Sequence, residues 1–149
     1  MDLFNQNEVK AEWLHPTEFP SMKGRDVVAI DLETCDTDLK KMGPGWPRKV
    51  GDVIGIAVSS GDFTAYYPIA HEGGGNMDRS IIIEYIKEIC EDESIQKVFH
   101  NAQYDIGWLS VLNIEVKGYI HDTMIAAALL NENRYSFTLN SMVSEYLGE

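Results

Sequence analysis

The strongest constraint on the fold is the order in which strand-like and helix-like segments follow one another. Three β-rich segments come first, and helical and strand patterns alternate after them. The predicted strands are 27–32, 53–58, 63–69, 95–99 and 116–120, and the predicted helices are one from 78 onward, 101–112, 122–130 and 137–147. Strands joined by a hairpin pair antiparallel, whereas strands joined through a helix pair parallel. We therefore expect an α/β fold whose mixed five-stranded sheet combines a three-strand antiparallel meander with two parallel strands, with helices on both faces.

The domain organisation follows from where the regular patterns begin. Residues 1–25 are interrupted by Pro16 and Pro20 and are expected to form a polar lead-in, before a single domain over 26–149. Gly and Pro in 36–51 predict a loop. The N-terminus has no basic region before an apolar stretch, and no apolar run reaches the roughly 18 residues of a membrane span, so we expect a cytoplasmic protein without a secretory signal or membrane segment.

The charge balance limits how this chain can meet nucleic acid. It has 12 Lys and Arg residues against 24 Asp and Glu, giving a formal net charge of -12. Binding by neutralisation of phosphates needs clustered basic residues, so this composition argues against it. Clustered carboxylates, however, hold hard divalent cations, which in turn hold phosphate. The positions of the acids therefore decide the question.

Two acids lie at the end of the first predicted strand. Strand alternation places Asp31 and Glu33 on one face, opposite the apolar Val28 and Ile30, roughly 6–7 Å apart along the strand. Two carboxylates at this position repel each other unless a cation lies between them, which favours a metal site. The alternative is that the strand ends at Asp31 and both acids are solvated loop residues.

A third acid lies where the fourth predicted strand leads into a helix. Asn101 is a candidate helix cap, and Asp105 lies one turn further along the same face. That face continues as Trp108, Leu109 and Leu112, which predicts that it packs on the sheet. In a sheet of this order, Asp105 can meet Asp31 and Glu33.

Four segments resemble one known family. Ala29–Thr34 (AIDLET) resembles the first motif, and His100–Asp105 (HNAQYD) the second motif, of the DEDD-type 3′–5′ exonucleases, which have a ribonuclease H-like fold. The stretch His121–Glu149 is similar to the segment that follows the second motif in that family. The hairpin Ile54–His71 is more similar to the proofreading domain of family A (DNA polymerase I-like) polymerases than to ribonuclease D. The resemblance covers about residues 26–149.

The resemblance implies an activity and a role for each matched residue. Asp31, Glu33 and Asp105 would be catalytic metal ligands for two divalent ions, Mg²⁺ or Mn²⁺, with Asp31 bridging the two ions. Thr34, Asn101 and Tyr104 match positions that contact the 3′-terminal nucleotide. The implied reaction is two-metal hydrolysis of the 3′-terminal phosphodiester of single-stranded DNA, with RNA a less favoured substrate. A polymerase domain would be expected in the full-length protein.

The sequence departs from the family at the third motif. That motif, Tyr-x-x-x-Asp or His-x-x-x-x-Asp, supplies a fourth acid, and the only match here, His100 with Asp105, already belongs to the second motif. We therefore expect a domain truncated at its C-terminal end that binds metal weakly and has little or no hydrolytic activity. Asp122 is the remaining candidate acid, and its preferred interpretation is a helix N-cap.

Two other functions remain possible from the sequence. One is a ribonuclease D-like RNA 3′-end exonuclease, and the other is a non-catalytic ribonuclease H-like binding module. Aromatic side chains able to stack on bases are Tyr66, Tyr67 and Trp46, whereas Trp108 is expected in the core.

Overall fold

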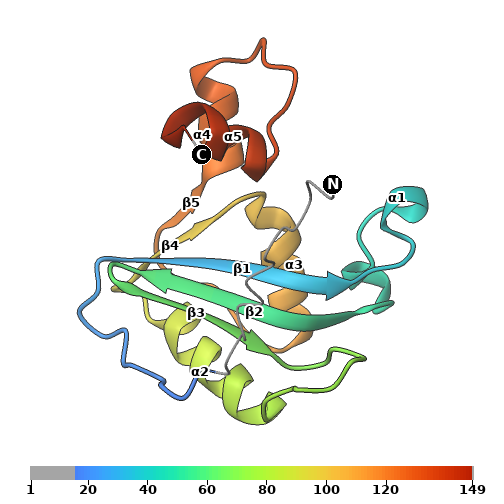
Figure 1. Cartoon of the computed structure of the whole chain (residues 1–149), viewed down its shortest axis with the longest axis vertical. Helices are drawn as coiled ribbons and strands as arrows, with labels where there is room; N and C mark the ends of the chain where they lie inside the picture. The colour runs from blue at the N-terminus through green and yellow to red at the C-terminus, as the bar shows by residue number, and fades with distance from the viewer. Residues whose placement is uncertain (1–15, 149) are drawn as a thin grey trace, which may run out of the picture.

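The computed structural model describes residues 16–148, which form a five-stranded sheet with helices packed around it (Figure 1). The strands are β1 Val27–Cys35, β2 Asp52–Ser60, β3 Phe63–Pro68, β4 Gln96–Phe99 and β5 Ile120–Asp122. The helices are α1 Leu39–Met42, the 3₁₀ turn η1 Trp46–Arg48, α2 Arg79–Glu91, α3 Ala102–Val111, α4 Thr123–Leu130 and α5 Leu139–Leu147. The strand order is β3-β2-β1-β4-β5, antiparallel from β1 to β3 and parallel for β4 and β5. The predicted mixed sheet is confirmed.

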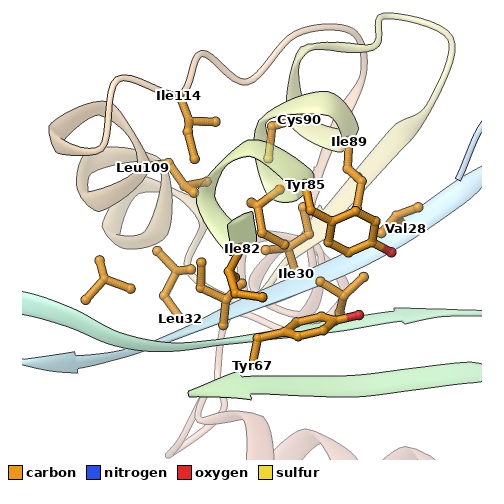
Figure 2. Close-up of a cluster of buried hydrophobic side chains, with 14 of the residues drawn as sticks. Val28, Ile30, Leu32, Tyr67, Ile82, Tyr85, Ile89, Cys90, Leu109 and Ile114 are labelled. Atoms are coloured by element: carbon orange, nitrogen blue, oxygen red, sulfur yellow. The ribbon is translucent and has the colours of Figure 1, made fainter. Parts of the chain in front are cut away.

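β1 lies at the centre of the sheet and separates its two faces. Val28, Ile30 and Leu32 are buried on one face, as strand alternation requires. Figure 2 shows these side chains facing Ile82 and other apolar residues of α2, with Leu109 of α3 alongside. α2 and α3 therefore cover the same face, and their packing fixes where the first turn of α3 meets β1.

The opposite face of the sheet is more open. It bears the alternate residues of β1, among them Asp31, and a shallow depression of about 210 Å³ there is bordered by Thr123 and Leu139, at the starts of α4 and α5. The first residues of these two helices thus border the face that carries the acids.

Residues 16–25 contain no helix or strand, as expected of a lead-in. They nevertheless join the core, because Met22 is buried and Phe19 stacks on Tyr67 of β3. The Tyr85 hydroxyl donates a 3.0 Å hydrogen bond to the Pro20 carbonyl. Met22 therefore belongs to the core although it lies in the expected polar lead-in. The expected absence of a secretory signal concerns residues that lie outside the described part of the chain.

Two other expectations about local structure are wrong. The last strand was expected at 116–120 but is Ile120–Asp122, because the chain turns at Gly118 (φ 77°) and the Lys117 amide bonds the Cys90 carbonyl at the end of α2. The expected loop 36–51 contains α1 and η1, since single helical turns fit between its glycines and prolines. Between residues 16 and 148, no helix is long and apolar enough to cross a membrane.

Candidate active site

Asp31 and Glu33 belong to β1, which continues to Cys35. The alternative of a strand ending at Asp31 is therefore wrong. Both side chains are exposed on the face opposite the α2 packing surface. The register between β1 and β2 shifts between Glu33 and Thr34, so an irregularity in the ladder directly follows the two acids.

Asp105 reaches the same end of β1 from the first turn of α3. Its side chain is 3% exposed, and its carboxylate accepts a hydrogen bond from the backbone N–H of Leu32. Burial raises the pKa of Asp105 to about 7, with a further contribution from the negative charge of Asp31. The charge of Asp31 therefore acts on Asp105, which agrees with the predicted proximity of these two acids but does not extend to Glu33.

Asp31 also interacts with His100, the first residue of the HNAQYD segment, to which no separate role was assigned from the sequence. Partial desolvation raises the pKa of Asp31 even though the side chain is exposed to solvent, and the nearby His100 opposes this shift. The His100 ring lies 2.8 Å from the Thr123 hydroxyl and 2.8 Å from the Phe137 carbonyl oxygen. His100 thus links Asp31 to the segment between α4 and α5.

The residues expected to contact the terminal nucleotide are arranged in two groups. The hydroxyls of Thr34 and Tyr104 lie 2.7 Å apart, and Tyr104 also donates a weaker 3.3 Å bond to Asp36. Asn101 is exposed and has left-handed backbone angles (φ 69°, ψ 53°). Its side chain forms no cap on α3, so the expectation that Asn101 caps this helix is wrong.

Asp122 is the N-cap of α4, as preferred from the sequence. Its side chain accepts hydrogen bonds from the N–H groups of Met124 and Ile125. Burial would raise the pKa of Asp122, but backbone N–H donors hold it below its ordinary value. This carboxylate is therefore ionised, and its oxygens are hydrogen-bonded to backbone N–H groups.

Tyr66 and His71 form a pair beside Glu33 that the sequence did not indicate. The Tyr66 hydroxyl lies 2.5 Å from Nε2 of His71. Burial raises the pKa of Tyr66, and the charge of Glu33 adds to this shift. Tyr66 reaches this position across Gly55, the register partner of Glu33, where a Cβ would lie 1.9 Å from the Tyr66 hydroxyl. Only glycine leaves room for this crossing.

Most of the aromatic candidates for base stacking are already packed. Tyr67 and Trp108 are fully buried, so the suggestion for Tyr67 is wrong and the core assignment of Trp108 is confirmed. Trp46 lies against Gly107 of α3, where a Cβ would come within 2.3 Å of its ring. Its indole is thus part of the contact between η1 and α3.

The donor chemistry of this site fits a hard divalent cation. Asp31 and Asp105 supply carboxylate oxygens, and both have raised pKa values, so a cation between them would relieve unfavourable charge. Within residues 16–148, however, no group of three or more His, Cys, Asp or Glu side chains is arranged to hold a metal ion. The structure therefore offers a carboxylate pair, with Glu33 two residues further along the same strand face.

Comparison with known proteins identifies the fold and the family of the chain. The fold is ribonuclease H-like. The profile of the 3′–5′ exonuclease domain found in family A DNA polymerases matches residues 17–149, and the chain belongs to this 3′–5′ exonuclease family.

Two curated relatives are polymerases. The chain is 33% identical over 144 residues to a DNA-directed DNA polymerase of Pseudomonas phage M6, covering 93% of this chain and 22% of the relative. It is 29% identical over 130 residues to DNA polymerase I of Pseudomonas aeruginosa, covering 83% of this chain and 13% of that one. The chain thus spans less than a quarter of either relative.

A solved structure supports the fold. Brucella melitensis NrnC, determined with bound Mg²⁺, aligns with a TM-score of 0.60 at 23% identity, over 87% of this chain and 58% of that one.

Proposed function

We propose that this domain is the 3′–5′ proofreading exonuclease module of a DNA polymerase. Its substrate would be the single-stranded 3′ end of DNA, and its reaction the hydrolysis of the 3′-terminal phosphodiester. The observation that carries the proposal is the pairing of Asp31 on β1 with the buried Asp105 on α3. Burial and the charge of Asp31 both raise the pKa of Asp105, so two ionised carboxylates are unfavourable there. Such a pair is stable when a divalent cation lies between its members.

In the proposed reaction, one set of residues would bind metal ions and another would orient the substrate. Asp31, Glu33 and Asp105 would hold two divalent ions, Mg²⁺ or Mn²⁺. Bound metal would supply an activated water and stabilise the departing 3′ oxygen. Thr34, Tyr104 and Asn101 would orient the terminal nucleotide, the first two through hydroxyls that already face each other. Metal binding is expected to be weak, since the described residues offer a pair of ligands and not a cluster of three.

The wider context is also a proposal. The two relatives are polymerases of which this domain matches only a part, which supports a polymerase domain as its partner. One relative comes from a phage and the other from a bacterium, which supports a place in the bacterial or infected-host cytoplasm.

The test is a metal titration combined with a trimming assay. The chain is titrated with Mn²⁺ by calorimetry and incubated at high concentration with a 5′-labelled single-stranded DNA oligonucleotide, with Asp31→Ala as the site variant. Asp62→Ala is the control, because Asp62 is 92% exposed and its only described ion pair is to Arg25 at 3.5 Å. We expect weak Mn²⁺ binding and slow shortening from the 3′ end, both lost in Asp31→Ala and retained in the control.

Other outcomes point to the other functions. Faster trimming of an RNA oligonucleotide of the same sequence would favour an RNA 3′-end exonuclease. Absence of Mn²⁺ binding, together with oligonucleotide binding that survives Glu33→Ala, would indicate a non-catalytic module and overturn the proposal.

A further inference from the structure

The carboxylate of Asp122 joins the starts of two helices. Its Oδ1 accepts hydrogen bonds from the N–H groups of Met124 (2.9 Å) and Ile125 (3.3 Å) in α4, and from that of Asn101 (3.1 Å) before α3. Its Oδ2 accepts the N–H of Ala102, the first residue of α3, at 2.8 Å. Four backbone donors therefore converge on one side chain.

The sheet explains why a residue of β5 can reach α3. Asp122 is the register partner of Phe99, the last residue of β4, so it lies beside the point where the chain leaves β4 for α3. α3 depends on this outside cap, because the Asn101 side chain forms no cap of its own. Thr123 reinforces the same junction by donating a 3.2 Å hydrogen bond to the Phe99 carbonyl.

The helix that Asp122 fixes is the one that carries Asp105. Asp105 lies in the first turn of α3 and contacts the Leu32 backbone of β1. A carboxylate accepts about four hydrogen bonds, and Asp122 uses this capacity on backbone donors, which leaves little for direct metal ligation. Its contribution to the site must therefore act through the position of α3.

We propose that Asp122 is a positioning residue that fixes the first turn of α3, and with it Asp105, against β1 for metal binding. This inference rests on the proposed function, because it concerns the same carboxylate pair. A serine or threonine has one oxygen and can cap one helix, whereas the two oxygens of Asp122 serve α4 and α3 together.

Because the two oxygens of Asp122 accept from different backbone donors, one variant can remove the acceptor for α3 and keep the acceptor for α4. Asp122→Asn keeps one carbonyl oxygen for α4 and Asn101 and replaces the oxygen that accepts from Ala102 with an NH₂ group. The matched control is Asp78→Ala, which removes the N-cap of α2, where the Asp78 side chain accepts from the N–H groups of Ser80 and Ile81. Both changes disturb a helix cap, but only one of these helices carries a proposed ligand.

The experiment measures Mn²⁺ affinity by calorimetry and thermal unfolding for the full chain and the two variants. We expect Asp122→Asn to weaken Mn²⁺ binding about 10- to 100-fold, the range for residues that orient metal ligands. Asp78→Ala is expected to lower the melting temperature with unchanged Mn²⁺ affinity. If Asp122→Asn does not fold, Asp122→Ser keeps a cap oxygen for α4 and takes its place.

Three results would overturn the inference. The first is that Asp122→Asn binds Mn²⁺ as tightly as the unmodified chain. The second is that Asp78→Ala weakens Mn²⁺ binding as much as Asp122→Asn does. Either result would mean that Asp122 contributes only to the stability of the fold. Asp31→Ala is measured in parallel. If Asp31→Ala also binds Mn²⁺ normally, the proposed metal site itself fails, and that failure is distinguishable from a failure of Asp122 alone.

Discussion

The hydroxyls of Thr34 and Tyr104 lie 2.7 Å apart and connect the end of β1 to the first turn of α3. Both residues were expected to contact substrate, and each is here the hydrogen-bond partner of the other. A bound 3′ end can therefore use a pair of hydroxyls that is already oriented.

This pair gives the first prediction. Tyr104→Phe removes the hydroxyl but keeps the ring beside Trp108, so we expect a stability loss of about 1 kcal/mol or less. The affinity for a single-stranded DNA oligonucleotide, followed by fluorescence anisotropy in the presence of Mn²⁺, should fall several-fold. So small a stability loss leaves the protein folded, so it does not account for weaker binding. Tyr119→Phe is the control, because Tyr119 is 77% exposed. Equal affinities for the two variants would remove Tyr104 from the binding site.

The second prediction concerns pH in the absence of metal. The pKa of Asp105 is raised from 3.8 to about 7, so the folded state binds a proton more tightly than the unfolded state. The resulting stability is fully present below about pH 4 and is lost as the pH rises through about 7, at no more than about 1.4 kcal/mol per pH unit. Urea unfolding in EDTA at several pH values measures this dependence of the unfolding free energy on pH. Asp105→Asn should flatten this dependence, and an unchanged slope would contradict the assignment.

The third prediction concerns charge at the carboxylate pair. Asp31→Asn removes the repulsion with Asp105, so we expect the variant to be more stable than the unmodified chain in EDTA. Added Mn²⁺ should raise the melting temperature of the unmodified chain, with about 2.7 kcal/mol of stabilisation at 100 times Kd, and should leave the variant nearly unchanged. Asp62→Asn, an exposed acid, should respond as the unmodified chain does.

The fourth prediction tests how η1 packs on α3. Gly107→Ala would place a Cβ 2.3 Å from the Trp46 ring, which must then move. We expect a destabilisation of about 1–3 kcal/mol, typical of overpacking, together with a change in tryptophan fluorescence. Gly73→Ala is the matched control, because a Cβ there meets no atom within 4 Å. A normal melting temperature for Gly107→Ala would show that the loop accommodates the methyl group.

Much of this fold could be predicted from the sequence because its signals are local. The alternation in β1 separates Leu32 from Asp31, and the helical spacing after Asn101 places Asp105 toward the sheet. The start of α2 was equally clear, since the predicted helical pattern begins at 78, the position of its N-cap Asp78.

The remaining features depend on contacts between distant segments. Met22 joins the core only because residues 16–25 pack against β3 and α2, and nothing local to the segment indicates this. The cap of α3 comes from Asp122, about twenty positions away, in place of the adjacent Asn101. Tyr66 reaches Glu33 only because Gly55 lies between them without a side chain.

The early end of β4 has a consequence for the whole site. β4 pairs with β1 only at Val27–Ala29, so at Leu32 only β2 still pairs with β1, and the Leu32 N–H donates to Asp105. One carboxylate therefore completes the sheet and belongs to the acidic pair at the same time. The fold and the chemistry cannot be altered independently at this position, and an amide, which keeps the acceptor oxygen while removing the charge, is the substitution that separates them.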